Sequence, residues 1–288
     1  MADAREQKNE VFKAGAPGID PRIQQISAVD KVRQDFGLDI PVELMPLPSA
    51  GLVYPEDSPL HGVTTVELRA MTAREEDILT SKAYLKKGTV ITELIKSCLI
   101  DKRIDPRDML VGDRNALMVA IRITGYGEAY DVEMECPECK LKSQRSFDLS
   151  QLPIKRLEIQ PVVPGENLFE FNLPVSKKRV QFRFLTGRDE EEILTVSEKQ
   201  KKMGIQVEST VTTNLAYSVV SIDGITDKNK IKQFINLMPA RDSLELRKYI
   251  SQNEPGIIMR QETSCQCGWS EEVNIPLGVT FLWPNAGQ

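Results

Sequence analysis

The chain has 288 residues, of which 41% are hydrophobic and 27% charged, and its formal net charge is −5. This composition is sufficient for one large or two small domains with ordinary cores, but a mildly acidic chain has no overall attraction to a phosphate backbone. Nucleic-acid binding would require a local basic patch, and the densest basic stretches are short and interrupted by nearby acids. These stretches lie at 140–145, 177–179 and 199–202.

The sequence also argues against a membrane protein and against an enzyme. It has no run of about 18 apolar residues, and its polar start lacks the apolar centre of an export signal. We therefore expect the chain to fold in a reducing cytosol. His61 is the single histidine, so a Ser-His or Cys-His nucleophile would depend on this one loop residue. Neither a glycine-rich phosphate loop nor a His-Glu-x-x-His motif occurs.

Residues 1–62 are predicted to form an extended, proline-rich N-terminal arm. The segment is polar up to about Asp35, seven prolines interrupt it, and residues 46–51 cannot be helix interior. Residues 42–54 contain more apolar side chains than a pure linker needs. The interpretation is an arm that lies on its own body or on a neighbouring subunit; the alternative is a disordered tail with a few adhesive residues.

A strand followed by a capped helix is predicted where the chain first becomes globular in pattern. Val66, Leu68 and Ala70 alternate with polar residues, as in a half-buried strand. Thr72 and Glu75 have the Thr-x-x-Glu spacing of a capping box, in which each residue satisfies a free amide of the first helical turn. Acidic residues then occupy the positive end of the helix, where anions are favoured.

The same pattern recurs about 115 residues later. Val180, Phe182 and Phe184 alternate in the same way, and Thr186 repeats the cap position before Asp189. The aligned stretches are 69–80 and 183–195, with one extra acidic residue in the second. An apolar helical stripe follows in both places. The stripes are Val90, Leu94, Ile95, Cys98 and Leu99 in the first, and Val211, Leu215, Ala216, Val219 and Val220 in the second.

Each copy then continues to a further helix, a strand-like run and a pair of cysteines. The sequence therefore predicts an internal duplication: repeat 1 at 63–150, connecting strands at 151–180, and repeat 2 at 181–288. A short alternating run at 168–171 is expected to form a hairpin with 180–184. The alternative is two unrelated helical segments that share common capping chemistry. The predicted fold class is α+β, with two pseudo-repeats of strand, helices, strand and cysteine knuckle.

Four cysteines in two close pairs predict one metal site shared by the repeats. Cys136-Pro-Glu-Cys139 has the spacing of a zinc knuckle, and its proline stiffens the turn. Cys265-Gln-Cys267 has only one residue between the thiols, and the following Gly268 suits a turn that needs positive φ. About 125 residues separate the pairs, which excludes a local finger. We expect a structural, zinc-ribbon-like site with all four cysteines as ligands.

Two other interpretations of these cysteines stay open, namely a redox Cys-x-x-Cys pair and free buried thiols. A four-cysteine zinc site is closed, so it leaves no position for a catalytic water and contributes stability instead. Cys98 lies on an apolar helical stripe and is interpreted as a core residue. The sequence thus predicts no catalytic residues and no cofactor other than structural zinc.

Several stretches resemble the T4-type baseplate proteins of contractile-tailed bacteriophages, over most of the chain. They are 46–51 (Pro-Leu-Pro-Ser-Ala-Gly), 71–80, 111–115, 130–139 and the final 276–284. The resemblance implies a protein of the virion or of virion assembly, in or near the hub and inner wedges of the baseplate. It implies no catalytic residues, and the one-residue spacer of the second cysteine pair departs from a regular knuckle.

The functional hypothesis is therefore a structural baseplate component that holds neighbouring baseplate and hub subunits through its arm and zinc-stapled body. The expected location is the tail baseplate of the virion, after assembly in the host cytoplasm, with no membrane, nucleic-acid or small-molecule partner. One alternative is a hub-assembly chaperone absent from the mature virion; a second is a zinc-ribbon nucleic-acid-binding protein. The apolar cluster at 281–284 is interpreted either as an interface anchor or as a tail that docks in the core.

Overall fold

The computed structural model describes residues 35–37, 39–202, 210–275, 277 and 279–282. The chain divides into two compact units, Met1–Pro41 and Val42–Gln288. Most of the first unit lies outside the described residues, and the prediction for the first part of the arm therefore falls outside them too. Within the described part of the chain, no helix has the length and apolar character needed to cross a membrane.

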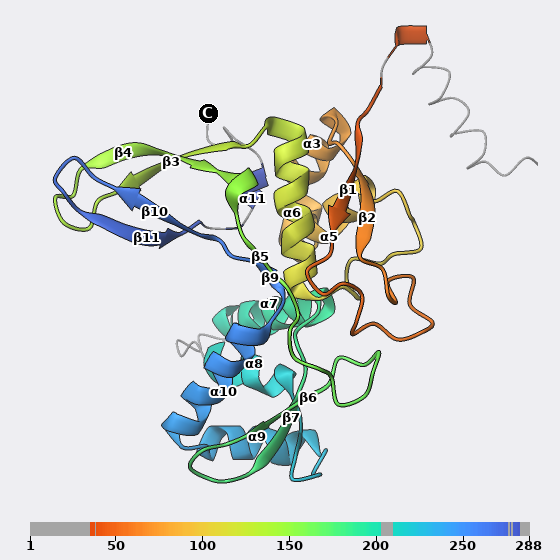
Figure 1. Ribbon diagram of the computed structural model, residues 1–288, viewed down its shortest axis with the longest axis vertical. Coiled ribbons are helices and arrows are strands. Elements are labelled where there is room, and N and C mark those ends of the chain that lie inside the picture. Colours follow the sequence, from red (N-terminus) through yellow and green to blue (C-terminus); the bar gives the residue numbers. More distant parts are fainter. Residues whose placement is uncertain (1–34, 38, 203–209, 276, 278, 283–288) are drawn as a thin grey trace, which may run out of the picture. The chain divides into compact units, whose positions relative to one another are not determined.

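The second unit mixes helices and strands, which confirms the α+β composition at this level (Figure 1). We refer to residues 42–151 as its first half and to residues 152–275 as its second half. The first half contains, in order, β1 (Val42–Pro46), β2 (Thr65–Arg69), α3 (Ala73–Thr80), α4 (Lys82–Lys87), α5 (Val90–Cys98), α6 (Val111–Tyr126), β3 (Ala129–Glu135) and β4 (Lys142–Asp148). A short 3₁₀ turn, Leu149–Gln151, closes it.

The second half begins with β5 (Ile154–Lys155) and β6 (Phe169–Asn172), and it ends in a hairpin as the first half does. The elements that follow β6 are β7 (Arg179–Phe182), α7 (Gly187–Lys202), α8 (Thr210–Ser218), β8 (Val219–Ile222), α9 (Lys228–Leu237), α10 (Ala240–Asn253), β9 (Gly256–Ile257), β10 (Arg260–Ser264) and β11 (Ser270–Asn274). A last short helix, α11 (Val279–Leu282), follows and contacts α6.

Residues 42–62, which the sequence assigned to the arm, lie on their own body. Strand β1 pairs antiparallel with β2, with Leu44 opposite Glu67. In the loop that follows, Leu47, Val53 and Leu60 are buried in the core. The boundary between the two compact units accordingly falls before Val42.

The predicted capping box at the start of α3 is present. The Glu75 carboxylate accepts hydrogen bonds from the amide and hydroxyl of Thr72, at 2.9 and 2.7 Å, and it pairs with the Arg69 guanidinium. Burial acts to raise the pKa of Glu75, but hydrogen bonds from Arg69, Ser97 and Thr72 outweigh it and lower that pKa to about 2. The carboxylate is therefore charged and fixes the turn between β2 and α3.

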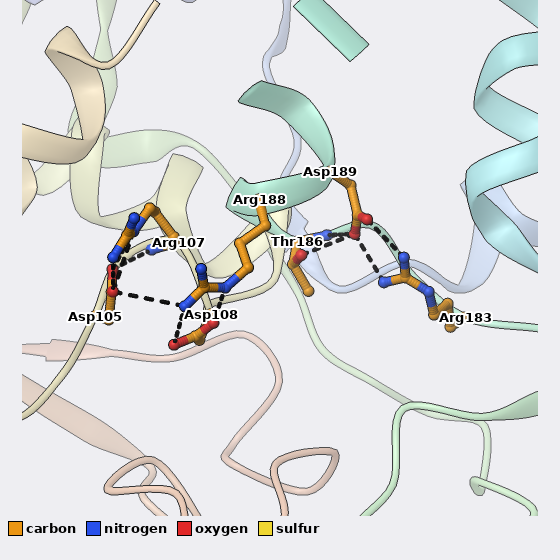
Figure 2. A network of polar contacts seen from close by, with 7 residues as sticks. All are labelled: Asp105, Arg107, Asp108, Arg183, Thr186, Arg188 and Asp189. Atoms are coloured by element: carbon orange, nitrogen blue, oxygen red, sulfur yellow. Dashed lines mark hydrogen bonds and ion pairs between the residues drawn. The ribbon is translucent and has the colours of Figure 1, made fainter. Parts of the chain in front are cut away.

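An equivalent cluster stands at the start of α7, as Figure 2 shows. The Asp189 carboxylate accepts from the amide and hydroxyl of Thr186, both at 2.8 Å. It also receives two hydrogen bonds from the Arg183 guanidinium, at 2.7 and 2.6 Å. The shorter Asp side chain thus takes the place of Glu75 without loss of any of these contacts.

A second recurring contact joins a Leu-Pro loop to the first turn of a later helix. In the first half, Asp113 of α6 accepts hydrogen bonds from the amide and hydroxyl of Ser49, which follows Leu47-Pro48. In the second half, Asp242 of α10 accepts from the amides of Val175 and Ser176, which follow Leu173-Pro174. Both aspartates are fully buried.

The hairpin expected between 168–171 and 180–184 is confirmed, with Phe169 opposite Phe182 in the β6–β7 register. The stripe expected to continue through Val219 and Val220 on one helix is wrong in its second part. Helix α8 ends at Ser218, and both valines belong to β8, which pairs with β7. Their β-branched side chains suit a strand, and the free edge of β7 supplies hydrogen-bond partners that periodicity alone does not reveal.

The two halves are joined by backbone pairing between the loop before α6 and the turn before α7. The amide of Val111 donates to the Leu185 carbonyl, and the amide of Gly187 donates to the Met109 carbonyl. On the surface beside this pairing, Arg188 contacts Asp108 and Asp105 (Figure 2). Gly112 packs so closely on the second half that a Cβ there would lie 1.7 Å from the Pro255 carbonyl oxygen.

Candidate metal centre

The first cysteine pair lies in the turn of the β3–β4 hairpin. The strands pair from Ala129–Asp148 to Glu135–Lys142, so Cys136 directly follows the last paired residue of β3. The amide of Cys136 donates to the Leu141 carbonyl, and the amide of Lys140 donates to the Cys136 carbonyl. Lys140 takes a positive φ of 59°, which turns the chain back into β4. Pro137, which directly follows Cys136, restricts the backbone at the start of the same turn.

The second pair lies in the turn of the β10–β11 hairpin, which is one residue shorter. Its last strand pair is Ser264–Ser270. The amide of Cys265 donates to the Trp269 carbonyl, and the amide of Gly268 donates to the Cys265 carbonyl. Gly268 has φ of 93°, a conformation that favours glycine. The one-residue spacer between the thiols is therefore accommodated within a regular hairpin turn.

The two turns bring the four sulfur atoms together. The Sγ atoms of Cys136 and Cys267 are 3.7 Å apart, as are those of Cys139 and Cys265, and all four lie within 4.8 Å of one another. Zinc–sulfur bonds near 2.3 Å in a tetrahedron place sulfurs about 3.8 Å apart. The described chain thus contains a set of four cysteines that could hold a metal ion of this size. Cys136 and Cys265 are buried, whereas Cys139 and Cys267 are exposed.

The thiols of the second pair have unequal acidity. The Cys267 amide donates to the Cys265 sulfur and, with the other thiols of the cluster, lowers the pKa of Cys265 to about 6. The Trp269 amide acts to lower the pKa of Cys267, but desolvation and the adjacent sulfurs outweigh it and raise that pKa to about 11. The Cys265 thiolate therefore forms readily, and its negative charge opposes ionisation of the adjacent Cys267 thiol.

Other contacts hold the two hairpins against each other and against the helices. The Gln261 side chain on β10 donates to the Asp148 carbonyl at the end of β4, at 2.7 Å. Phe281 of α11 is fully buried and packs on the Tyr130 ring of β3, with centroids 5.1 Å apart. Of the two interpretations of the C-terminal apolar cluster, docking in the core holds for Phe281 and Leu282, and residues 283–284 lie outside the described chain.

A shallow cleft of about 390 Å³ lies beside the cluster and gives solvent access to it. Glu138, Cys139, Cys267, Gly268 and Trp269 line this cleft. An ion and water can therefore reach the two exposed sulfurs, while the other two face the interior.

The remaining residues singled out from the sequence lie apart from the sulfur cluster. Cys98 is fully buried among the core residues of α5, and this burial raises the pKa of its thiol to about 12. His61 is exposed in its loop, where Nδ1 lies 2.7 Å from the Tyr54 carbonyl oxygen. Neither residue belongs to the set of four cysteines.

The sequence interpretation missed one buried polar cluster in the first half. The Tyr54 hydroxyl donates to the Asp113 carboxylate at 2.6 Å and accepts from the Leu110 amide at 2.9 Å. Desolvation outweighs the hydrogen bonds from Ser49 and Tyr54 and raises the pKa of Asp113. The available signal was that residues 46–51 and 111–115 both stood out as motifs, without any sign that they meet. Their contact fixes the loop over the start of α6.

Comparison with known proteins shows to which family of proteins the chain belongs. A model of the family described as "T4 bacteriophage base plate protein" matches residues 54–283. The match covers most of the chain and contains both hairpins and all four cysteines, so the chain belongs to this family. It is a bacteriophage baseplate protein, and the resemblance inferred from its motifs is confirmed. No curated protein and no solved structure matches the chain.

Proposed function

We propose that this protein is a structural, non-enzymatic component of a contractile-tail baseplate, whose body is made rigid by one zinc ion. The single observation that supports this most is the convergence of four sulfurs from two hairpins that are far apart in sequence. A site with four thiolate ligands is saturated, so its contribution is to stability and not to catalysis. A rigid body of this kind suits a subunit that holds neighbours in register.

The body is proposed to be an internal duplication. Three arrangements recur in the same order in both halves: a Leu-Pro loop bonded to a buried aspartate, an Arg–Thr–carboxylate cluster at a helix start, and a cysteine hairpin. Cys136 follows Asp113 by 23 residues, and Cys265 follows Asp242 by the same interval. Common capping chemistry explains one such cluster, but it does not explain the shared order of all three or the equal interval between aspartate and cysteine.

Zinc would be held by Cys136, Cys139, Cys265 and Cys267, one pair from each half, as in a zinc ribbon. When bound it supplies the double positive charge that lets all four sulfurs be thiolates. The chain itself provides the two turns and the contact between the hairpins. The ion would thereby join the end of the first half to the end of the second, beyond the backbone pairing that already connects them.

The N-terminal unit is proposed to contact other baseplate and hub proteins. It is a separate compact unit that precedes β1, so its loss leaves the core of the body in place. We expect a chain without residues 1–40 to fold and to bind zinc, but not to enter assembled baseplates in the host cytoplasm. Normal incorporation of this truncated chain would refute the role of the arm.

Elemental analysis and particle composition together test the proposal. One zinc per purified chain, and presence of the chain in purified virions, are the expected results. A zinc-containing chain that is absent from virions would instead favour the assembly-chaperone alternative. Absence of zinc from protein purified under reducing, metal-replete conditions would contradict the proposal that one zinc ion makes the body rigid.

A further inference from the structure

A cleft of about 340 Å³ lies between α6, α7 and the turn that joins α4 to α5. Its apolar wall consists of Ile91, Met118, Leu194 and Leu277. Leu194 is 52% exposed, and a Cβ added to Gly88 would lie 3.7 Å from its Cδ1 atom. Sites for small ligands start at about 300 Å³, so this cleft has room for one long side chain.

The polar wall of the cleft carries more negative than positive charge. Arg114 is only 3% exposed, and its guanidinium donates to Oε2 of Glu190 at 3.0 Å and to the Thr92 hydroxyl at 3.1 Å. The Thr92 hydroxyl in turn donates to Oε1 of Glu191. Within the described residues, the second oxygen of each carboxylate accepts no hydrogen bond, and Arg114 Nε has no partner. One cation therefore serves two carboxylates, and one negative charge is left unbalanced.

Neighbouring cations do not supply the missing charge. Lys86 and Lys87 end α4 beside the cleft, but both are exposed, and in the part of the chain that the structure describes neither forms an ion pair with its carboxylates. Other cations of the adjoining segments already have carboxylates of their own: Arg107 pairs with Asp105, Arg183 with Asp189 and Arg188 with Asp108.

The carboxylates around the cleft also disfavour one another. Burial raises the pKa of Glu190, and the neighbouring carboxylates of α7 act in the same direction, against the attraction of Arg114. Burial likewise raises the pKa of Glu254 to about 7, where Lys155 acts to lower it and Glu190 acts to raise it further. A cation placed in the cleft would relieve this repulsion, whereas an anion would add to it.

The described end of the chain runs away from the cleft. Arg114 stands in the first turn of α6, whereas Phe281 of α11 packs on Tyr130, which follows the other end of that helix. A helix of this length spans about 24 Å at about 1.5 Å per residue. The chain therefore passes the cleft at Leu277 and continues to the far end of α6 without filling it.

We propose that this cleft binds a lysine side chain of a neighbouring baseplate protein. The inference rests on the proposed scaffold function and extends it by assigning a contact site and the chemistry of the partner. The four-carbon stem of lysine packs on the apolar wall, and its ammonium donates to the free oxygens of Glu190 and Glu191. Asn115, which also lines the cleft, offers a further acceptor.

The carboxylate geometry favours lysine over arginine. Each of the two carboxylates has one oxygen already bonded within the chain, so neither can receive the two parallel hydrogen bonds of a guanidinium. An ammonium is compact and has three donors that can reach oxygens of different residues.

A phage that lacks this gene, complemented with variants of the full chain, provides the test. Glu190→Gln combined with Glu191→Gln keeps an acceptor oxygen for Arg114 and for Thr92 but removes both charges. This pair is expected to lower incorporation into baseplates about tenfold, equivalent to about 1.4 kcal/mol. Glu198→Gln, at an exposed position of the same helix, is the matched control and should leave incorporation unchanged. Circular dichroism and zinc content verify that every variant is folded.

A second variant fills the cleft from within. Position 194 lies four residues after Glu190 and three after Glu191, the spacings at which helical side chains meet. The ammonium introduced by Leu194→Lys should occupy the place of the partner's lysine and lower incorporation about tenfold. Leu194→Met introduces an unbranched stem without a charge, and it should leave incorporation unchanged. Wild-type incorporation of both Leu194→Lys and the paired glutamine variant would overturn the proposal.

A photo-crosslinker at position 194 identifies the occupant in assembled baseplates. The expected product joins it to a lysine-containing segment of a different baseplate protein. Replacement of that lysine by glutamine should lower incorporation about tenfold, with no further loss when Glu190→Gln and Glu191→Gln are also present. Crosslinks to a second copy of this chain, to DNA or to a segment without lysine, or none at all, would overturn the proposal, as would additive losses. The scaffold function would still stand if Cys136→Ser abolished incorporation while the cleft variants assembled normally.

Discussion

Removal of one sulfur from the cysteine cluster should cost the body most of its stability. Cys136→Ser replaces a buried cysteine, one of the four ligands of the proposed zinc ion, by a hydroxyl that binds zinc far more weakly than a thiolate. The lost connection joins residues 136 and 267, whose sulfurs lie 3.7 Å apart. A covalent link that closes a loop of this length restrains the unfolded chain by about 5 kcal/mol. Structural zinc in small peptides is worth roughly 10–16 kcal/mol, which is an upper guide here.

Domains are typically stable by only about 5–15 kcal/mol, so a loss of about 5 kcal/mol or more leaves little. We therefore expect Cys136→Ser to lack zinc and to be poorly soluble, or to unfold at a much lower urea concentration than the parent chain. The measurements are elemental analysis and urea unfolding followed by circular dichroism. Cys98→Ala is the matched control, because that thiol is buried outside the cluster. It should keep one zinc per chain and lose only a core contact.

The reasoning fails if Cys136→Ser retains stoichiometric zinc, or if it unfolds at the same urea concentration as the parent chain. It also fails if a strong chelator does not change the urea concentration at which half of the parent chain is unfolded. The first result would mean that the ion is held without this sulfur. The others would mean that the fold does not depend on the ion.

Three further predictions follow, one from the cysteine cluster itself and two from buried polar contacts elsewhere in the body. Mild oxidation of zinc-free protein should form disulfides between the two cysteine pairs and none within a pair, because the 3.7 Å contacts run between the hairpins; peptide mapping without reduction would reveal any other linkage. Tyr54→Phe should lower the free energy of unfolding by about 2 kcal/mol, because it leaves the buried Leu110 amide without an acceptor; an unchanged urea midpoint would contradict this. Glu75 has a pKa lowered to about 2, so its stabilisation is present above the unfolded-state pKa near 4.5 and is lost as pH falls towards 2. Glu75→Gln should therefore flatten the acid dependence of unfolding over that window, and an unaltered dependence would count against the ion pair.

The features that the sequence alone determined are those encoded within a few neighbouring residues. A threonine three positions before a carboxylate specifies a capped helix start, whether the acid is Glu75 or Asp189. Strand alternation at 180–184 and the cysteine spacing at 136–139 are equally local. For this reason the capping clusters, the β6–β7 hairpin and the membership of a baseplate family could all be predicted before the fold was known.

The tertiary structure decided whatever depends on distant partners. Val219 and Val220 fit a helical stripe, yet they form a strand because the edge of β7 is available to them. Asp113 and Asp242 look like ordinary first-turn acids, and only the arrival of a Leu-Pro loop from far away buries them. These contacts join segments that are far apart in sequence, so only the folded chain reveals them.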